Sequence, residues 1–202
     1  MKQITALKEQ VKNKKRVSVY LDGEFYCGLD LVTALKYRLK VGEFIEESRL
    51  VEIQYQAEMQ SCFDKALSFI STSVKTEKQI KDKLLGLGYL EEIVEKAIEK
   101  LKSYGYVDDG DFANRFVSTY KGVKGKKLIK LELRRKGVSE KDVENAVDDI
   151  ESQQDACDGI CDKYLKNKEK DQKTLLKCYK YLLSKGFDYD EAKRSIERYN
   201  ED

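Results

Sequence analysis

Side chains that commonly carry catalysis are sparse in this chain of 202 residues. It contains no histidine, which removes the commonest general base and every Ser–His or Cys–His pair. Neither a G-x-x-x-x-G-K-[ST] loop nor a G-x-G-x-x-G loop is present to hold nucleotide phosphates, although "KGVKGKKL" at 121–128 is rich in glycine and lysine. We therefore predict no catalytic residue, no cofactor-binding residue and no enzymatic activity.

Five cysteines, at positions 27, 62, 157, 161 and 178, are the candidate metal ligands. Cys157 and Cys161 share a helix face and Cys178 could approach them, but a structural zinc site needs a fourth ligand. An odd, irregularly spaced set in a chain without secretory features is typical of reduced thiols. We therefore expect small buried side chains, no disulfide and no metal.

The acidic run "DDGD" at 108–111 resembles the start of a calcium-binding loop. It lacks the glycine at the sixth position of such a loop and the distal glutamate. Capping of a helix N-terminus is therefore the favoured interpretation.

Positive charge is concentrated in one stretch, although the whole chain carries a formal charge of only +2. Residues 111–136 hold nine basic and two acidic side chains, a net of +7, whereas residues 140–158 hold one basic and eight acidic ones, a net of −7. We predict that eight bases of the first segment bind a partner: Arg115, Lys121, Lys124, Lys126, Lys127, Lys130, Arg134 and Arg135.

Two kinds of partner fit this basic segment. One is an acidic surface on a protein, and the other is nucleic acid, with phosphates meeting the lysines and arginines and Tyr120 stacking on a base. A third interpretation is that the bases form only a solvated helix face. The charge pattern by itself does not choose between them.

A repeat with a period of 49 residues organises the chain from about residue 61 onward. The skeleton Ile80-x-x-x-Leu84-x-x-x-Gly88 recurs with its glycine at positions 137 and 186, and an apolar residue follows each glycine. Further apolar residues at offsets of 3, 4 and 7 indicate one more helix after each glycine. Each unit therefore reads as three helices, in which the glycine ends the second helix in a left-handed conformation.

Helix starts and exposed faces can also be predicted from the repeat. Thr76, Gly125 and Thr174 occupy equivalent positions before the second helix, and Thr76 with Gln79 forms a capping box. In "IKLELRRKGV" at 129–138, Ile129 and Leu133 should face the core. Lys127, Lys130 and Arg134 should then form a row that projects into solvent.

The first 60 residues follow a different pattern. "RVSVYLDGEFYCGL" alternates apolar and polar residues, and Asp22-Gly23 is typical of a type I′ hairpin. "LVTALKYRLKVG" at 31–42 predicts a short helix closed by Gly42, and a long helix over roughly 48–71 should lead into the repeats. We predict a mostly α protein with an N-terminal β-hairpin/helix module at 1–60 and three-helix repeats at 61–107, 108–152 and 153–202.

The stretch from about 62 to 150 resembles the RecX family of bacterial regulators. The resemblance is carried by Gly88-Tyr89, by Gly105-Tyr106-Val107-Asp108-Asp109 followed by Phe112-Ala113, and by Gly125, Leu133 and Lys136-Gly137. The hairpin module and a third, weaker repeat are also like longer members. Ser73 departs from the pattern, in which arginine is frequent, so a basic contact there is not expected.

The resemblance implies a non-catalytic protein that binds the filament of the RecA recombinase on DNA, bridges neighbouring protomers and hinders filament growth, ATP hydrolysis and strand exchange. DNA within or near the filament is a second expected contact. The chain has no apolar run long enough for a membrane span and no signal-peptide core at its start. We therefore expect a cytoplasmic monomer that does not bind membranes.

Overall fold

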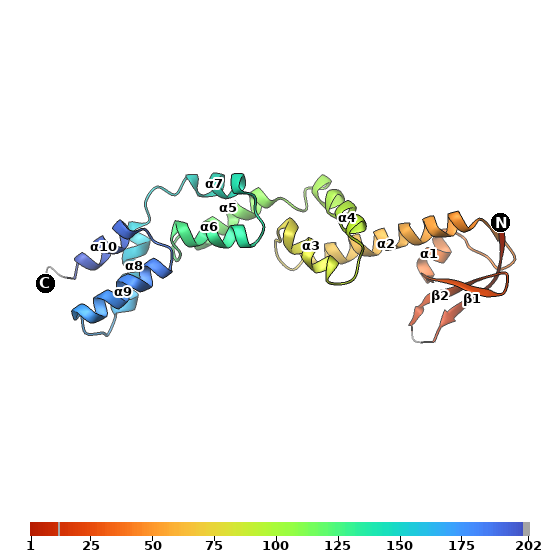
Figure 1. The fold of residues 1–202 in the computed structure, drawn as a ribbon, viewed down its shortest axis with the longest axis horizontal. Coiled ribbons are helices and arrows are strands. Elements are labelled where there is room, and N and C mark those ends of the chain that lie inside the picture. The colour runs from red at the N-terminus through yellow and green to blue at the C-terminus, as the bar shows by residue number, and fades with distance from the viewer. Residues whose placement is uncertain (12, 200–202) are drawn as a thin grey trace. The chain divides into compact units, whose positions relative to one another are not determined.

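Alternating apolar residues at the start of the chain form a four-stranded antiparallel sheet. Strands β1 (Lys2–Gln10), β2 (Asn13–Leu21) and β3 (Glu24–Asp30) form a meander, and β4 (Phe44–Ile45) pairs with β1 (Figure 1). The computed structural model describes residues 1–11 and 13–199. These residues fall into two compact units, 1–71 with 83–101 and 72–82 with 102–199.

The predicted hairpin turn between β2 and β3 is confirmed. Asp22 and Gly23 have φ values of +50° and +91°, the two positive values that a type I′ turn requires, and Leu21 pairs with Glu24 across it. Gly23 N–H donates to Thr5 Oγ1 at 2.9 Å, which ties the turn to the neighbouring strand β1.

The helix predicted to close at Gly42 is shorter than expected. Helix α1 (Leu31–Lys36) ends six residues earlier, because Arg38 takes a left-handed φ of +53° and Leu39 N–H donates back to the Ala34 carbonyl at 3.0 Å. Leu39 is thereby buried in the core of the sheet module. Gly42, at φ +93°, turns the chain separately before β4.

Helix α2 (Glu47–Ile70) matches the long helix predicted over 48–71. Its first turns bury Leu50 and Ile53 among the inward-facing residues of the strands, including Ile4, Val19 and Leu29. Near its other end, Cys62 and Ala66 are fully buried. One continuous helix thus contributes to two separate sets of buried residues.

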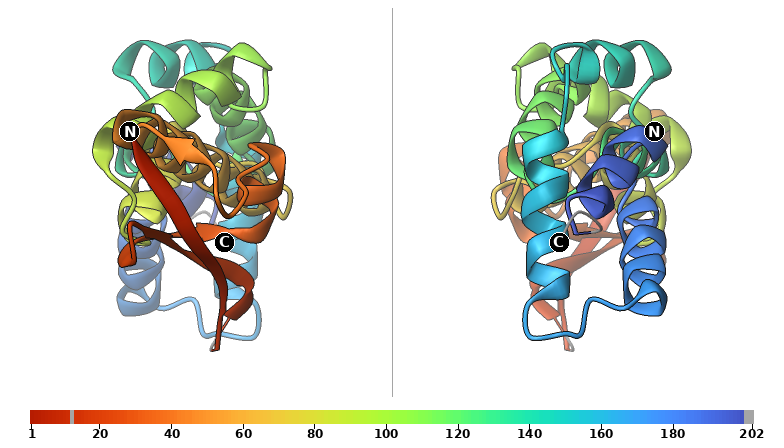
Figure 2. Two further views of the ribbon diagram at one scale, coloured as in Figure 1. Left: turned by 90° about the vertical axis from the view of Figure 1, so that its right-hand side faces the viewer. Right: turned by 90° about the vertical axis from the view of Figure 1, so that its left-hand side faces the viewer.

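Further helices follow α2 along the repeats, as predicted. They are α3 (Glu77–Leu85), α4 (Glu91–Ser103), α5 (Asp109–Tyr120), α6 (Lys126–Arg135), α7 (Glu140–Asp148), α8 (Gln154–Leu165), α9 (Gln172–Ser184) and α10 (Tyr189–Glu197). In the third repeat α8, α9 and α10 pack against one another, as the right-hand view of Figure 2 shows. The mostly α fold of tandem three-helix repeats behind a small strand module is therefore confirmed.

The aligned apolar positions form the cores of the repeats. In the second repeat Ile129 and Leu133 of α6 pack with Val143 and Val147 of α7 and with α5. Cys178 and Leu182 hold the same places in the third repeat. All five cysteines are free and buried, so they fill core space as the sequence predicted.

The recurring glycines end the second helix of each repeat, as predicted. Gly88, Gly137 and Gly186 have φ values of +89°, +91° and +87°. In each case the next residue donates its N–H to the carbonyl four residues before the glycine, at 3.4, 3.2 and 3.4 Å respectively. This is the Schellman arrangement, in which the left-handed residue lets the chain reverse while helix carbonyls stay paired.

Two junctions of the same kind join successive repeats within the second unit. The predicted capping box of Thr76 with Gln79 is present, and Thr76 Oγ1 also donates to the Lys136 carbonyl at 2.6 Å. One period later, Gly125 N–H donates to the Lys185 carbonyl at 2.8 Å. The start of α3 thus meets the glycine turn after α6, and the start of α6 meets the glycine turn after α9.

The third repeat departs from this pattern at its helix start. Thr174, predicted to precede the helix, lies within the first turn of α9, and Asp171 is the N-cap, accepting from Thr174 N–H at 2.8 Å. The Asp171 carboxylate accepts a hydrogen bond from a backbone amide that has no partner within the helix, so Asp171 is an effective N-cap. Helix α9 therefore begins earlier than α3 and α6 do relative to the repeat.

The junctions predict that alanine will lower stability by different amounts at two glycines that share the same backbone conformation. A Cβ on Gly137 would lie 2.4 Å from Lys78 Cβ, whereas a Cβ on Gly88 meets no described atom within 4 Å. Gly88→Ala should therefore cost only the left-handed strain of about 1–2 kcal/mol, and Gly137→Ala should cost clearly more. Thermal melts followed by circular dichroism measure both.

Gly159→Ala is the matched control, because Gly159 lies inside α8 with open space around it. There alanine should stabilise by roughly 0.5–1 kcal/mol through its higher helix propensity. Equal melting temperatures for the Gly88 and Gly137 variants would contradict the proposed packing of the junction.

Candidate partner-binding surface

The basic residues predicted to bind a partner all lie in the second repeat and belong to one unit. Arg115 is on α5, Lys121 and Lys124 follow it, and the other five lie on α6. The segment is continuous in sequence, but the environments of its side chains differ widely. The side chains therefore have to be considered one by one.

Most of these cations are paired with carboxylates of the same unit. The salt bridges are Arg115–Asp111 at 2.8 Å, Lys124–Glu132 at 2.5 Å, Lys127–Asp188 at 2.6 Å, Lys130–Glu144 at 2.6 Å and Arg134–Glu140 at 2.5 Å. Two of these pairs, Lys130–Glu144 and Arg134–Glu140, join α6 to α7, whereas the other three lie within the basic segment or reach Asp188. Sequence reasoning missed this because charge counts along a chain ignore neighbours across a helix pair.

The expectation that Lys127, Lys130 and Arg134 all project into solvent is therefore corrected. Lys130 is only 23% exposed and donates to both carboxylate oxygens of Glu144. Arg134 is exposed. Its hydrogen bond to Glu140 raises the pKa of the Arg134 guanidinium and lowers the pKa of the Glu140 carboxyl. Lys127 is exposed, and its hydrogen bond to Asp188 raises its pKa.

Lys126 and Tyr120 are also engaged within the unit. Lys126 is half-buried, and its Nζ donates to the Ile150 carbonyl at 3.2 Å. The ring of Tyr120 lies 4.5 Å from that of Phe116, and Lys124 Nζ sits 4.1 Å from the Tyr120 centroid. The Tyr120 ring is thus already covered by a cation and a second ring, which leaves less of it for a nucleic-acid base.

Two cations of the predicted segment remain exposed without an acidic partner among residues 1–11 and 13–199. They are Lys121, at the end of α5, and Arg135, at the end of α6. These two side chains are the ones that can meet a partner without first breaking an internal pair.

A row of lysines on α9 was missed by the sequence analysis. Lys173, Lys177 and Lys180 are exposed, are spaced along one helix face, and form no salt bridge within the described part of the chain. Residues 163–185 hold eight lysines against Glu169 and Asp171, so a count of charges in this segment would also have pointed to the lysine row. The spacing of four and three residues on a helix was the signal that could have revealed it.

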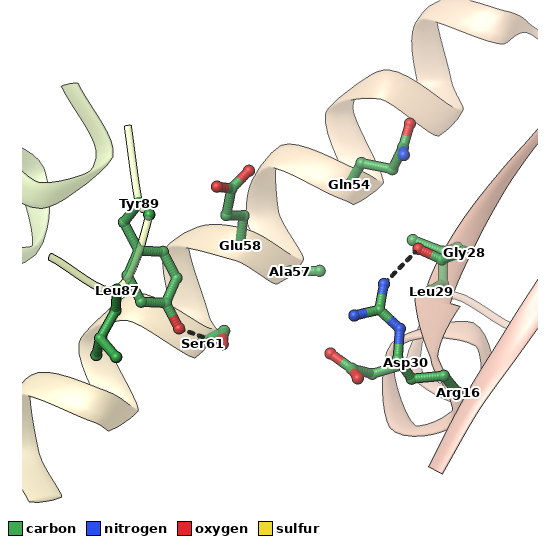
Figure 3. Close-up of a pocket in the computed structure, with 11 residues that line it drawn as sticks. Arg16, Gly28, Leu29, Asp30, Gln54, Ala57, Glu58, Ser61, Leu87 and Tyr89 are labelled. Atoms are coloured by element: carbon green, nitrogen blue, oxygen red, sulfur yellow. Dashed lines mark hydrogen bonds between the residues drawn. The ribbon is translucent and has the colours of Figure 1, made fainter. Parts of the chain in front are cut away.

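A cavity of about 410 Å³ lies in the first unit beside the glycine turn that follows α3 (Figure 3). Leu87, Gly88 and Tyr89 line one side, and α2 lines another with Glu58 and Ser61. The Tyr89 hydroxyl and Ser61 Oγ are hydrogen-bonded at 2.9 Å, which holds the turn against α2.

A second cavity, of about 680 Å³, lies where the starts of α3, α5 and α7 converge in the second unit. Asp108 caps α5 by accepting from Asp111 N–H at 2.9 Å, as "DDGD" predicted. Asp109 accepts from Glu77 N–H at 2.8 Å and so joins α5 to the start of α3. Burial raises the pKa of the Asp109 carboxyl, and the Glu77 carboxylate adds to this shift.

Across residues 1–11 and 13–199, no group of three or more His, Cys, Asp or Glu side chains is arranged to hold a metal ion. Within the same residues, none of the helices has the length and apolar content needed to cross a membrane.

Family models match most of the chain. The regulatory protein RecX N-terminal domain matches residues 2–46, the first RecX three-helix domain matches 62–101, and the second matches 108–147. The matched boundaries separate the strand module from two of the three-helix repeats.

Whole relatives and solved structures are similar over nearly all of the chain. The regulatory protein RecX of Clostridium botulinum (strain Alaska E43 / Type E3) is 34% identical over 196 residues, which cover 94% of this chain and 92% of the relative. That of Clostridium tetani (strain Massachusetts / E88) is 32% identical over 201 residues, covering 96% and 93%. A crystal structure of regulatory protein RecX is 25% identical, with a TM-score of 0.68, and covers 96% of this chain and 98% of that one. RecX from Lactobacillus salivarius gives 27% identity and a TM-score of 0.63, covering 71% and 97%.

Asp109 predicts a pH-dependent gain in stability. Because its folded-state pKa is raised above the ordinary value of 3.8, the ionised carboxylate is less favourable in the folded state at neutral pH. Asp109→Asn keeps an oxygen acceptor for Glu77 N–H and should stabilise by about 0.5 kcal/mol at pH 7. The gain should disappear as the pH falls through the raised pKa, where the parent carboxyl becomes protonated.

Denaturant unfolding at pH 7 and below pH 4 measures this effect. Asp148→Asn, on the exposed face of α7, is the control for removing one negative charge without altering a helix junction. An Asp109→Asn variant less stable than the parent at pH 7 would show that the ionised carboxylate is needed at this junction.

Proposed function

Because this chain belongs to the RecX family of regulatory proteins, we propose that it is a non-catalytic regulator that binds the RecA–DNA filament and inhibits the recombinase. Filament extension, ATP hydrolysis and strand exchange are the activities it lowers. It acts as a monomer in the cytoplasm. Its working modules are the segments 1–60, 61–107, 108–152 and 153–202.

The observation that carries this proposal is the repeated junction. Thr76 docks on Lys136 and Gly125 docks on Lys185, so the same contact recurs at the same sequence separation within one compact unit. Surfaces on successive repeats are therefore presented at regular intervals. A filament offers equivalent surfaces on successive subunits, and a protein built of equivalent modules can contact several of them at once.

The absence of histidine also supports a binding role. A regulator that lowers an activity by occupying a surface needs complementary charge and shape, and no proton-transfer group. The two exposed and unpaired cations of the second repeat, Lys121 and Arg135, are the proposed contacts of the basic segment with an acidic surface. Among the paired cations, Lys130 and Arg134 join α6 to α7 instead.

This assignment predicts different outcomes for two charge-altered variants. Lys121→Glu with Arg135→Glu should require roughly fivefold to tenfold more protein for half-inhibition of strand exchange, because two exposed contacts become repulsive. Asp111→Arg with Arg115→Asp reverses an internal pair of α5 and keeps its attraction, so it should inhibit nearly as well as the parent.

Strand exchange and filament ATP hydrolysis are measured against titrated protein at low salt, with circular dichroism to verify folding. Added salt should narrow the difference between the first variant and the parent. If the parent itself leaves both activities unchanged at saturating concentration, the proposed function is wrong. If the parent inhibits and the Lys121/Arg135 variant inhibits equally well, the assignment of Lys121 and Arg135 to the binding surface is wrong.

Direct binding to nucleic acid is a second candidate function, favoured by the exposed lysine row on α9. Lys173, Lys177 and Lys180 form no salt bridge within the described residues, so no internal ion pair has to break before they meet phosphates. Tyr164 and Tyr181 stack on each other in the same repeat, with ring centroids 4.9 Å apart. Lysines interleaved with aromatic rings are typical of surfaces that bind single strands.

Replacing the three lysines of this row with glutamate should reduce binding to bare single-stranded DNA. Each lost phosphate contact lowers the log–log salt slope by about 0.7, so the slope should fall by about 2. Binding to bare DNA and to preassembled filament is compared at several salt concentrations. An unchanged slope would exclude this row from phosphate contact, and filament binding without bare-DNA binding would favour the protein partner.

A further inference from the structure

The glycine turn after α3 lacks the docking contact that its two equivalents make. We name residues 85–90 the Gly88 turn. A Cβ on Gly137 would lie 2.4 Å from Lys78, and one on Gly186 would lie 2.4 Å from Leu128, because a helix start is seated on each. A Cβ on Gly88 would meet no described atom within 4 Å. All three glycine turns therefore offer the same docking surface, and among the described residues a helix start occupies it at Gly137 and Gly186.

The Gly88 turn also differs in composition. Leu85, Leu87 and Leu90 are 38%, 51% and 64% exposed, so the turn presents three large apolar side chains to solvent. At the turn after α6, the equivalent positions are Arg134, Lys136 and Ser139. The Gly88 turn, which holds no docked helix start among the described residues, is thus apolar, whereas the turn at Gly137, on which a helix start is seated, carries polar residues. Clustered exposed apolar side chains mark interaction sites.

We propose that the Gly88 turn is a docking site for the first turn of a helix in the protein partner, seated as α3 and α6 are seated on the turns at Gly137 and Gly186. The proposal rests on the proposed function for the existence of that partner. The two internal junctions show which features an occupant of the Gly88 turn needs. It is a helix start with a small N-cap residue, such as Thr76 or Gly125, and an aliphatic stem in its first turn, such as that of Lys78 or Leu128.

The charge around the turn favours the same occupant. The adjacent cavity in Figure 3 is lined by the carboxylates of Asp30 and Glu58, which form no salt bridge within the described residues, and by one cation, Arg16. Arg16 is directed to the Gly28 carbonyl at 3.1 Å. A helix N-terminus carries partial positive charge on its free amides, so carboxylates and apolar side chains suit it. Phosphates would be repelled by the same carboxylates.

A second copy of this chain is a poor occupant. In the third repeat the equivalent helix start is that of α9, where Asp171 places a carboxylate at the N-cap and uses it to accept from Thr174 N–H. That carboxylate would approach Asp30 and Glu58. The sequence of α9 therefore works against head-to-tail association of copies through the Gly88 turn, which would otherwise form open filaments.

The test uses the full chain with Leu87→Glu and Leu90→Glu combined, and Leu35→Glu with Val51→Glu as the control. Leu35 on α1 and Val51 on α2 are 68% and 55% exposed, so they match the exposure of the tested leucines, add the same charge and do not line the cavity of Figure 3. Binding to preassembled RecA filament is measured by fluorescence anisotropy, with melts to verify folding. The double variant should bind at least about tenfold more weakly, and the control should bind like the parent.

A photo-crosslinking phenylalanine analogue at position 87 identifies the occupant. Crosslinks to the first turn of a recombinase helix are expected, whereas crosslinks to DNA or to a second copy would overturn the proposal. Equal binding by the double variant and the parent would also overturn it and would leave the proposed function standing. Failure of the parent to bind filament would instead refute the proposed function on which the inference rests.

Discussion

A left-handed residue at the end of the second helix of each repeat is the constraint on which the rest of this structure depends. Gly88, Gly137 and Gly186 let the chain reverse within two residues, so that a third helix can fold back over the core. The same reversal leaves a carbonyl at the helix end facing outward. At Lys136 and Lys185 that carbonyl accepts the hydrogen bond from the preceding repeat, so one backbone conformation both completes a module and joins it to its neighbour.

The two junctions reach the same geometry by different chemistry. Thr76 uses its side-chain hydroxyl, whereas Gly125 uses its backbone N–H and approaches so closely that a Cβ there would lie 2.1 Å from Gly186. In the third repeat α9 begins earlier, and its N-cap is the Asp171 carboxylate instead of a threonine hydroxyl or a glycine.

Electrostatics in the second repeat are mainly internal. Helix α6 of the basic segment packs against α7 of the acidic segment, and the pairs Lys130–Glu144 and Arg134–Glu140 form across that contact. Such exposed and half-exposed pairs contribute little stability each, and salt weakens them. Lys121, Arg135 and the lysine row on α9 are exposed and form no salt bridge among the described residues.

The sequence by itself determined the repeats, their cores, the hairpin at Asp22-Gly23 and the helix ends at the three glycines, because these depend on local backbone preferences and on apolar spacing along one helix. It misplaced the end of α1, since Arg38 adopts a left-handed conformation that burial of Leu39 stabilises. Which cations form no internal salt bridge, and which glycine turns hold a docked helix start, could be read only from the folded structure. Those properties depend on side chains far apart in sequence, such as Lys127 and Asp188 or Thr76 and Lys136, whose proximity arises only when the modules dock.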